Sequence, residues 1–124
     1  MSVLLIVAAV LVSLLAVAHS YLGERHILLP LLRRSELPIA FRGRSFTRHT
    51  LRFAWHLTTV AWLGLAGQLV VLASPSGGGV RSLALVIAVT FAVSGIVALL
   101  GSRGRHPSWV VFFIVALLVW LAYR

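Results

Sequence analysis

The sequence predicts an all-α integral membrane protein: an antiparallel bundle of four transmembrane helices, with an interfacial segment between the first and second helices. Hydrophobic residues make up 60% of the 124-residue chain and charged residues only 10%, whereas soluble domains carry roughly 25% charged residues. The apolar residues also fall into four long runs. A soluble domain of this size could not bury so much apolar surface. We therefore expect lipid as the solvent and a single domain over residues 1–124.

The first apolar run predicts a transmembrane helix over about residues 2–22. Its length matches the roughly 20 residues that cross a hydrocarbon core of about 30 Å. Ala16, Val17 and Ala18 resemble the cleavage site of a signal peptide, but no basic residue precedes the run and many follow it. Because basic residues oppose translocation, we expect the run to remain in the protein as a helix.

A long connection over residues 23–49 follows the first run. Within it, residues 26–32 are apolar but too few to span a membrane. We interpret them as a segment that lies on the membrane surface, with neighbouring arginines at anionic lipid headgroups. The arginines expected there are Arg33, Arg34, Arg42 and Arg44.

The remaining runs predict transmembrane helices over about residues 50–73, 82–100 and 107–123. The last two are at the low end of the spanning range, and local thinning of the bilayer can accommodate such spans. A Ser-, Pro- and Gly-rich turn joins the second and third helices. Pro107 suits the first turn of the fourth helix, where its missing N–H costs nothing. Trp55 lies near a run end, as interface anchors do, whereas Trp62 is deeper.

The arginines are distributed very unevenly between the two sides of this topology. Arg81 and Arg124 fall on one side, and the other nine surround the first and third connections. The positive-inside rule places the nine in the cytoplasm. The sequence thus predicts a bacterial inner-membrane protein with both termini in the periplasm. The nine are Arg25, Arg33, Arg34, Arg42, Arg44, Arg48, Arg52, Arg103 and Arg105.

The composition limits the chemistry that the chain can perform. It has no Cys and no Asp, so disulfides, thiolate metal sites and cysteine nucleophiles are excluded, and Glu24 and Glu36 are the only carboxylate side chains. The arginines flank apolar segments, which indicates lipid headgroups as partners rather than nucleic acid. The glycine run at 77–79 lacks the Lys-Ser/Thr of a phosphate loop and is expected to form a turn.

All five histidines are expected at the arginine-rich end. His49, Arg52, His56 and Thr59 follow one face of the second helix. His19 closes the first helix, and antiparallel packing would bring this helix end to the start of the second. Polar groups within a membrane helix are costly and often functional. The candidate site residues are His19, Glu24, His26, His49, Arg52 and His56.

Three interpretations of this polar group remain open. The first is a structural network, with Glu24 neutralising Arg52 and His56 bonded to a Ser or Thr. The second is a haem or transition-metal site on His19 and His56, since imidazole suits several such metals. The third is a pocket for an anionic ligand, such as a lipid phosphate or a quinone oxygen.

Small residues in the third run predict a close-packing face, either within the bundle or toward another subunit. Through this face the protein could form a homo-oligomer or join a larger membrane complex. The residues concerned are Ala84, Ala88, Ala92, Gly95 and Ala98.

Together these observations predict a small multi-pass inner-membrane protein that acts as a non-enzymatic subunit or accessory factor with a basic cytoplasmic face. Two alternatives stay open: a haem- or metal-binding membrane protein that uses His19 and His56, and a small oligomeric channel or transporter.

Overall fold

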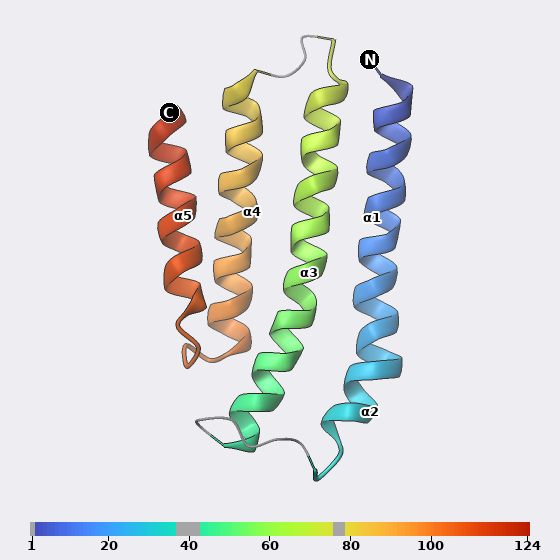
Figure 1. Ribbon diagram of the computed structural model, residues 1–124, viewed down its shortest axis with the longest axis vertical. Coiled ribbons are helices and arrows are strands. Elements are labelled where there is room, and N and C mark those ends of the chain that lie inside the picture. The colour runs from blue at the N-terminus through green and yellow to red at the C-terminus, as the bar shows by residue number, and fades with distance from the viewer. Residues whose placement is uncertain (1, 37–42, 76–78) are drawn as a thin grey trace.

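The computed structural model describes residues 2–36, 43–75 and 79–124, and this part of the chain is helical, with no strand. Figure 1 shows the long helical rods side by side. The elements are α1 (Val3–Gly23), the π-helical turn η1 (Glu24–Leu28), α2 (Leu29–Leu32), α3 (Arg44–Ala73), α4 (Val80–Gly101) and α5 (Ser108–Tyr123).

The first rod is longer than the sequence predicted. α1, η1 and α2 form one helical stretch of 30 residues, Val3–Leu32, whereas the helix was expected to end near residue 22. The end was expected there because the apolar run stops at Tyr21 and the next apolar stretch is short and follows Arg25. The helix nevertheless continues, through a π-helical turn that lies just before Pro30. The apolar segment at 26–32 is therefore a continuation of the first helix.

The second rod also begins earlier than predicted. α3 starts at Arg44 rather than near residue 50, so the connection after Leu32 is much shorter than residues 23–49. Hydropathy marks where a helix is apolar, but charged residues such as Arg48 continue the same helix beyond that point. Arg42, one of the arginines expected at lipid headgroups, lies outside the described residues.

Three of the rods are long and apolar enough to cross a membrane: Val3–Leu32, Arg44–Ala73 and Val80–Gly101. The fourth, α5, has 16 residues. At a rise of about 1.5 Å per residue it is about 24 Å long, shorter than a hydrocarbon core of about 30 Å. Length and composition thus support three spans in the described part of the chain, one fewer than predicted.

The rods pack in a row rather than around a common centre. α1 packs against α3, α3 against α4, and α4 against α5, while α1 has no extensive contact with α4 or α5 in the described chain (Figure 1). The N–H of Ser2 donates to the carbonyl of Ala73 at 3.0 Å. The start of α1 therefore lies beside the end of α3, and these two helices run in opposite directions.

Glycines allow close approach at each contact between rods. Gly23 of α1 lies under the indole of Trp55, and Gly64 of α3 faces Thr90 of α4. On α4, a Cβ added to Gly95 would lie 2.9 Å from Cε1 of Phe113 on α5. Small residues let helix backbones approach closely in membrane proteins. Gly95 of the small-residue face of α4 thus packs on α5 within the chain, while Ala84, Ala88 and Ala92 of this face line hollows beside α5.

The interior of the row is made almost entirely of alanine. The buried hydrophobic residues in the described chain are eight alanines with Leu28 and Phe53, and most large aliphatic side chains are exposed. Leu4 is 82% exposed and Leu100 71%. Such a surface is unfavourable in water at roughly 25 cal/mol per Å², and a lipid environment removes this cost.

Candidate functional site

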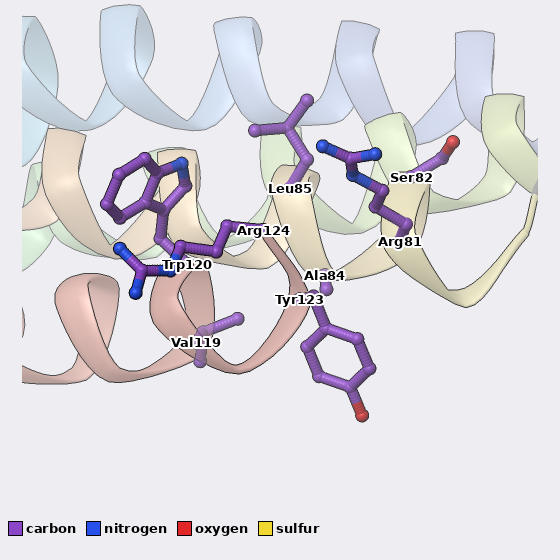
Figure 2. Close-up of a pocket in the computed structure, with 8 residues that line it drawn as sticks. All are labelled: Arg81, Ser82, Ala84, Leu85, Val119, Trp120, Tyr123 and Arg124. Carbon is purple, nitrogen blue, oxygen red and sulfur yellow. The ribbon is translucent and has the colours of Figure 1, made fainter.

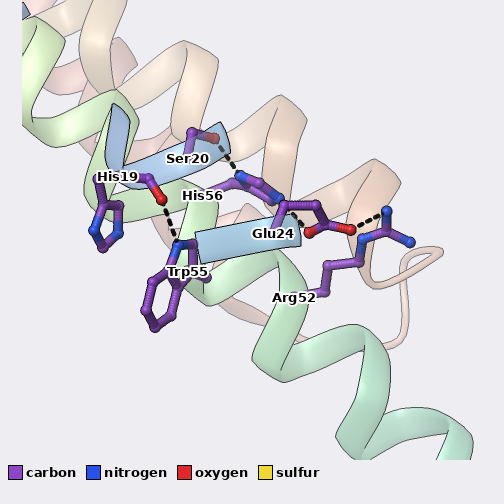
Figure 3. A network of polar contacts seen from close by, with 6 residues as sticks. All are labelled: His19, Ser20, Glu24, Arg52, Trp55 and His56. Carbon is purple, nitrogen blue, oxygen red and sulfur yellow. Dashed lines mark hydrogen bonds and ion pairs between the residues drawn. The ribbon is translucent and has the colours of Figure 1, made fainter. Parts of the chain in front are cut away.

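An ion pair joins the first two rods near the arginine-rich end. Glu24 opens the π-helical turn η1, and one of its carboxylate oxygens pairs with Arg52 of α3 (Figure 3). The Glu24 side chain is 19% exposed and that of Arg52 is 55% exposed. The sequence predicted this contact, because an unpaired charge at this depth would be costly.

His56 extends the ion pair into a hydrogen-bonded chain. Its Nε2 lies 3.1 Å from the second oxygen of Glu24, and its Nδ1 lies 2.6 Å from the Ser20 hydroxyl (Figure 3). A carboxylate only accepts hydrogen bonds, so Nε2 carries the proton and donates. In the neutral ring, Nδ1 then accepts from Ser20. Both ring nitrogens of His56 are thus occupied by side chains of the first rod.

The His19 side chain takes no part in these hydrogen bonds and instead packs against two tryptophans. Its ring stacks on Trp55 with centroids 4.5 Å apart and planes 2° apart, and it also meets Trp62 at 4.8 Å. The Trp55 indole N–H donates to the His19 carbonyl at 3.2 Å (Figure 3). Gly23 provides the space for the indole. The sequence indicated Trp55 as an interface anchor, and its role as a bridge between rods was missed.

The other histidines lie in separate surroundings. His26 is exposed in η1. His49 lies on α3 with its Nδ1 2.6 Å from the Ser45 carbonyl. His106 stacks with Phe46 at 6.0 Å between ring centroids and bonds the Ser108 hydroxyl. The five histidines share one end of the molecule but do not converge on one point.

This arrangement does not favour the metal or haem interpretation. His19 and His56 point away from each other in Figure 3. Both nitrogens of His56 already bond Ser20 and Glu24. Among the described residues, no group of three or more His and Glu side chains is placed to hold a metal ion. The contacts instead match the first interpretation, a polar network that holds α1 to α3.

The order Ser20, His56, Glu24 is also that of a nucleophile, a base and an orienting carboxylate. Acyl transfer further requires hydrogen-bond donors aimed at the developing oxyanion. Ser20 lies inside a helix, where backbone N–H groups bond carbonyls of the preceding turn. Arg52 is already paired with Glu24. We therefore interpret the hydrogen-bonded group of Ser20, His56 and Glu24 as a fixed structural contact rather than a catalytic centre.

Basic residues line two cavities beside this network. One of about 350 Å³ lies between α3 and α4 and includes His49, Arg52, His56 and Arg103. An adjoining one of about 240 Å³ lies between α2 and α3. Its lining residues are Leu29, Leu32, Arg33, Arg48, His49 and Arg52. Arg34 and Arg44, also expected at headgroups, are exposed and lie outside both linings.

The opposite end of the row has a basic cavity of its own. A hollow of about 390 Å³ between α4 and α5 is lined by Arg81, Arg124, Trp120 and Tyr123, among others (Figure 2). These are the two arginines that the sequence placed on the opposite side from the other nine. Arginine and aromatic residues together are typical of a membrane–water interface.

Comparisons with known proteins identified no relative of this chain. No family model matches the sequence, and neither the curated proteins nor the solved structures include a match.

A substitution at His56 distinguishes a structural network from a ligand site. We expect His56→Ala to lower the free energy of unfolding by about 1–3 kcal/mol, because Ser20 and Glu24 each lose a partner. His106→Ala serves as the control at the same end of the molecule. Thermal unfolding in detergent measures the change, and elemental analysis and an absorption spectrum of both proteins show whether a metal or haem is lost with it. Loss of a bound metal or haem in His56→Ala alone would contradict the structural interpretation.

Proposed function

We propose that the chain is a small multi-pass protein of the bacterial inner membrane that crosses the bilayer four times and acts as a non-enzymatic subunit or accessory factor. Three long apolar helices and an apolar surface with an alanine interior support insertion in lipid. The shorter α5 can complete a fourth crossing where the bilayer thins, with Arg105 and Arg124 reaching the headgroups from its two sides.

The observation that carries this proposal is the position of the arginines on the row of helices. Nine of the arginines lie in or around the first and third connections of the sequence. The helix ends next to these connections, the end of α2, the start of α3, the end of α4 and the start of α5, lie at one end of the row, and the start of α1 and the end of α5 lie at the other (Figure 1). The positive-inside rule then favours a cytoplasmic arginine-rich end and periplasmic termini. The arginines form a basic cytoplasmic face that attracts anionic lipid, at about 1 kcal/mol per residue near the surface.

The polar contacts favour an accessory role over catalysis or transport. Glu24, Arg52, His56 and Ser20 bind one another across the first two rods. The described helices form an open row, so a channel would need several copies to enclose a pore. Contact with a second copy or a larger membrane complex is part of this proposal. Gly95 of the small-residue face of α4 packs against Phe113 of α5, so such a partner would use the open faces of the row.

Reporter fusions test the proposed orientation. A periplasm-specific reporter fused after Arg124 is expected to be active, and a cytoplasm-specific reporter at the same position inactive. The nine arginines oppose translocation of the end of the row that carries them, so that end stays in the cytoplasm and the C-terminus lies in the periplasm. The reverse pair of activities would overturn the orientation and the cytoplasmic basic face. Fusions after Ser35, at the arginine-rich end, provide the internal control and should give the opposite result.

A further inference from the structure

We propose that the groove between α3 and α4 binds one anionic phospholipid, with its phosphate among His49, Arg52 and Arg103 and an acyl chain along the apolar part of the groove. This inference rests on the proposed function, because it places the phosphate in the leaflet that the basic end faces. It assigns a ligand class and a location that the sequence left open.

The basic part of the groove is the cavity of about 350 Å³ near the ends of α3 and α4. Its lining combines basic side chains with apolar ones, among them Val97 and Leu100. Arg52 pairs with Glu24. The sequence places nine arginines and only two carboxylate side chains at this end, so the net positive charge there favours binding of an anion from outside the chain.

The apolar part of the groove continues from the basic part. A second cavity of about 430 Å³ lies between the same two helices, lined by Val60, Leu63, Val89 and Val93 among others. Along α3, His49, Arg52, His56, Val60 and Leu63 recur every three or four residues, so they share one helix face. The two cavities are therefore successive parts of one groove, basic at its end and apolar further in.

The dimensions of this groove suit a lipid. From Arg52 to Leu63, α3 advances about 16 Å at about 1.5 Å per residue, close to half of a hydrocarbon core of about 30 Å. A phosphate at Arg52 would thus place an acyl chain along one leaflet. Guanidinium groups bind phosphate through paired N–H donors, and Arg52 retains a 55% exposed side chain beside its ion pair.

A backbone turn after α4 fixes the position of the Arg103 backbone. Arg103 lies in the turn that follows α4, in the left-handed region at φ 54°, and Gly104 follows at φ 73°. A non-glycine residue there is uncommon. Arg103 N–H bonds the Leu100 carbonyl at 3.1 Å and Gly104 N–H bonds that of Leu99 at 2.8 Å, which closes the helix end. Arg103 and Arg52 both line this cavity, Arg103 from the end of α4 and Arg52 from α3.

The test measures lipid binding by the purified full chain in a neutral detergent, by native mass spectrometry during titration with short-chain phosphatidylglycerol. Arg103→Gln is expected to weaken binding of the first lipid about fivefold, from about 1 kcal/mol per arginine near anionic lipid, and Arg103→Gln with His49→Gln is expected to weaken it further, because a hydrogen-bond donor of the site is also changed. Arg34→Gln is the matched control, since it removes the same charge from the same end outside both cavities. Equal weakening by Arg34→Gln and Arg103→Gln would overturn the site.

Two further arms identify the source of the phosphate. Val93→Phe, which fills the apolar part of the groove without changing charge, should weaken phosphatidylglycerol binding several-fold. Glycerol phosphate, the headgroup without acyl chains, should bind far more weakly than the lipid. If it binds as tightly, or if Val93→Phe has no effect, the lipid assignment is wrong. Because these measurements use detergent, they do not depend on orientation, and the reporter fusions can fail or succeed separately.

Discussion

Glu24→Gln is expected to loosen the contact between α1 and α3 and to lower the free energy of unfolding by about 1–3 kcal/mol. Removing one partner of a buried ion pair typically costs about 3–5 kcal/mol. The partly exposed Arg52 reduces this figure, because solvent screens its charge. The amide also holds His56 less strongly than the carboxylate does, since a charged acceptor makes the stronger hydrogen bond. Thermal unfolding in detergent measures the loss.

Glu36→Gln is the matched control for this substitution. It removes the same charge from the only other carboxylate side chain, and Glu36 is exposed. Its unfolding temperature should stay close to that of the unmodified chain. The double variant Glu24→Gln with Arg52→Gln should lose less stability than the sum of the two single changes, because both members of the pair are then neutral. Equal losses in Glu24→Gln and Glu36→Gln would show that the ion pair contributes nothing specific.

Gly23→Ala is expected to lower the free energy of unfolding by a net amount of up to about 2 kcal/mol. Its added Cβ would overlap the Trp55 indole, and overpacking of this kind typically costs about 1–3 kcal/mol. The substitution also improves helix propensity by roughly 1 kcal/mol, so a net loss of stability is diagnostic of the packing. The indole N–H bond to the His19 carbonyl and the stacking on the His19 ring should be disturbed together. A shift in Trp fluorescence should accompany the lower unfolding temperature.

Gly67→Ala is the matched control, since it gives the same gain in helix propensity. The nearest atom to its added Cβ would be Cγ1 of Val86 at 3.1 Å, which needs to move only a few tenths of an ångström. We expect a stability change of less than about 1 kcal/mol. If Gly23→Ala is as stable as Gly67→Ala, then Trp55 does not pack on Gly23 as described.

The polar contacts and the helical rods could be predicted in part from the sequence, because they follow from the free-energy cost of placing charged or polar groups in an apolar environment. The pairing of Glu24 with Arg52 follows from the cost of an isolated charge near the hydrocarbon core. The hydrogen bond between His56 and a hydroxyl follows from the cost of a buried, unsatisfied ring nitrogen. Apolar runs predicted the helical rods, since hydropathy reports which parts of the chain lipid can surround.

Other features could not be predicted because they depend on local geometry. The apolar run indicated a helix end near residue 22, yet the first rod continues through a π-helical turn to Leu32. Trp55 could be read equally well as an interface anchor, and only the placement of Gly23 makes it a bridge to His19. The open row also has no simple signal in the sequence. Apolar helices look alike whether lipid or another helix covers them, so hydropathy cannot tell a row from a closed bundle.

The central claim is that the arginine-rich end of the row lies in the cytoplasm, and cysteine accessibility tests it most directly. The chain has no cysteine of its own, so single cysteines at exposed serines can be labelled without background. Ser35→Cys lies at the arginine-rich end and Ser82→Cys at the opposite end, at the start of α4. With a membrane-impermeant maleimide, we predict that Ser82→Cys is labelled in intact cells and that Ser35→Cys is labelled only after the cells are broken. Labelling of Ser35→Cys but not Ser82→Cys in intact cells would contradict the claim.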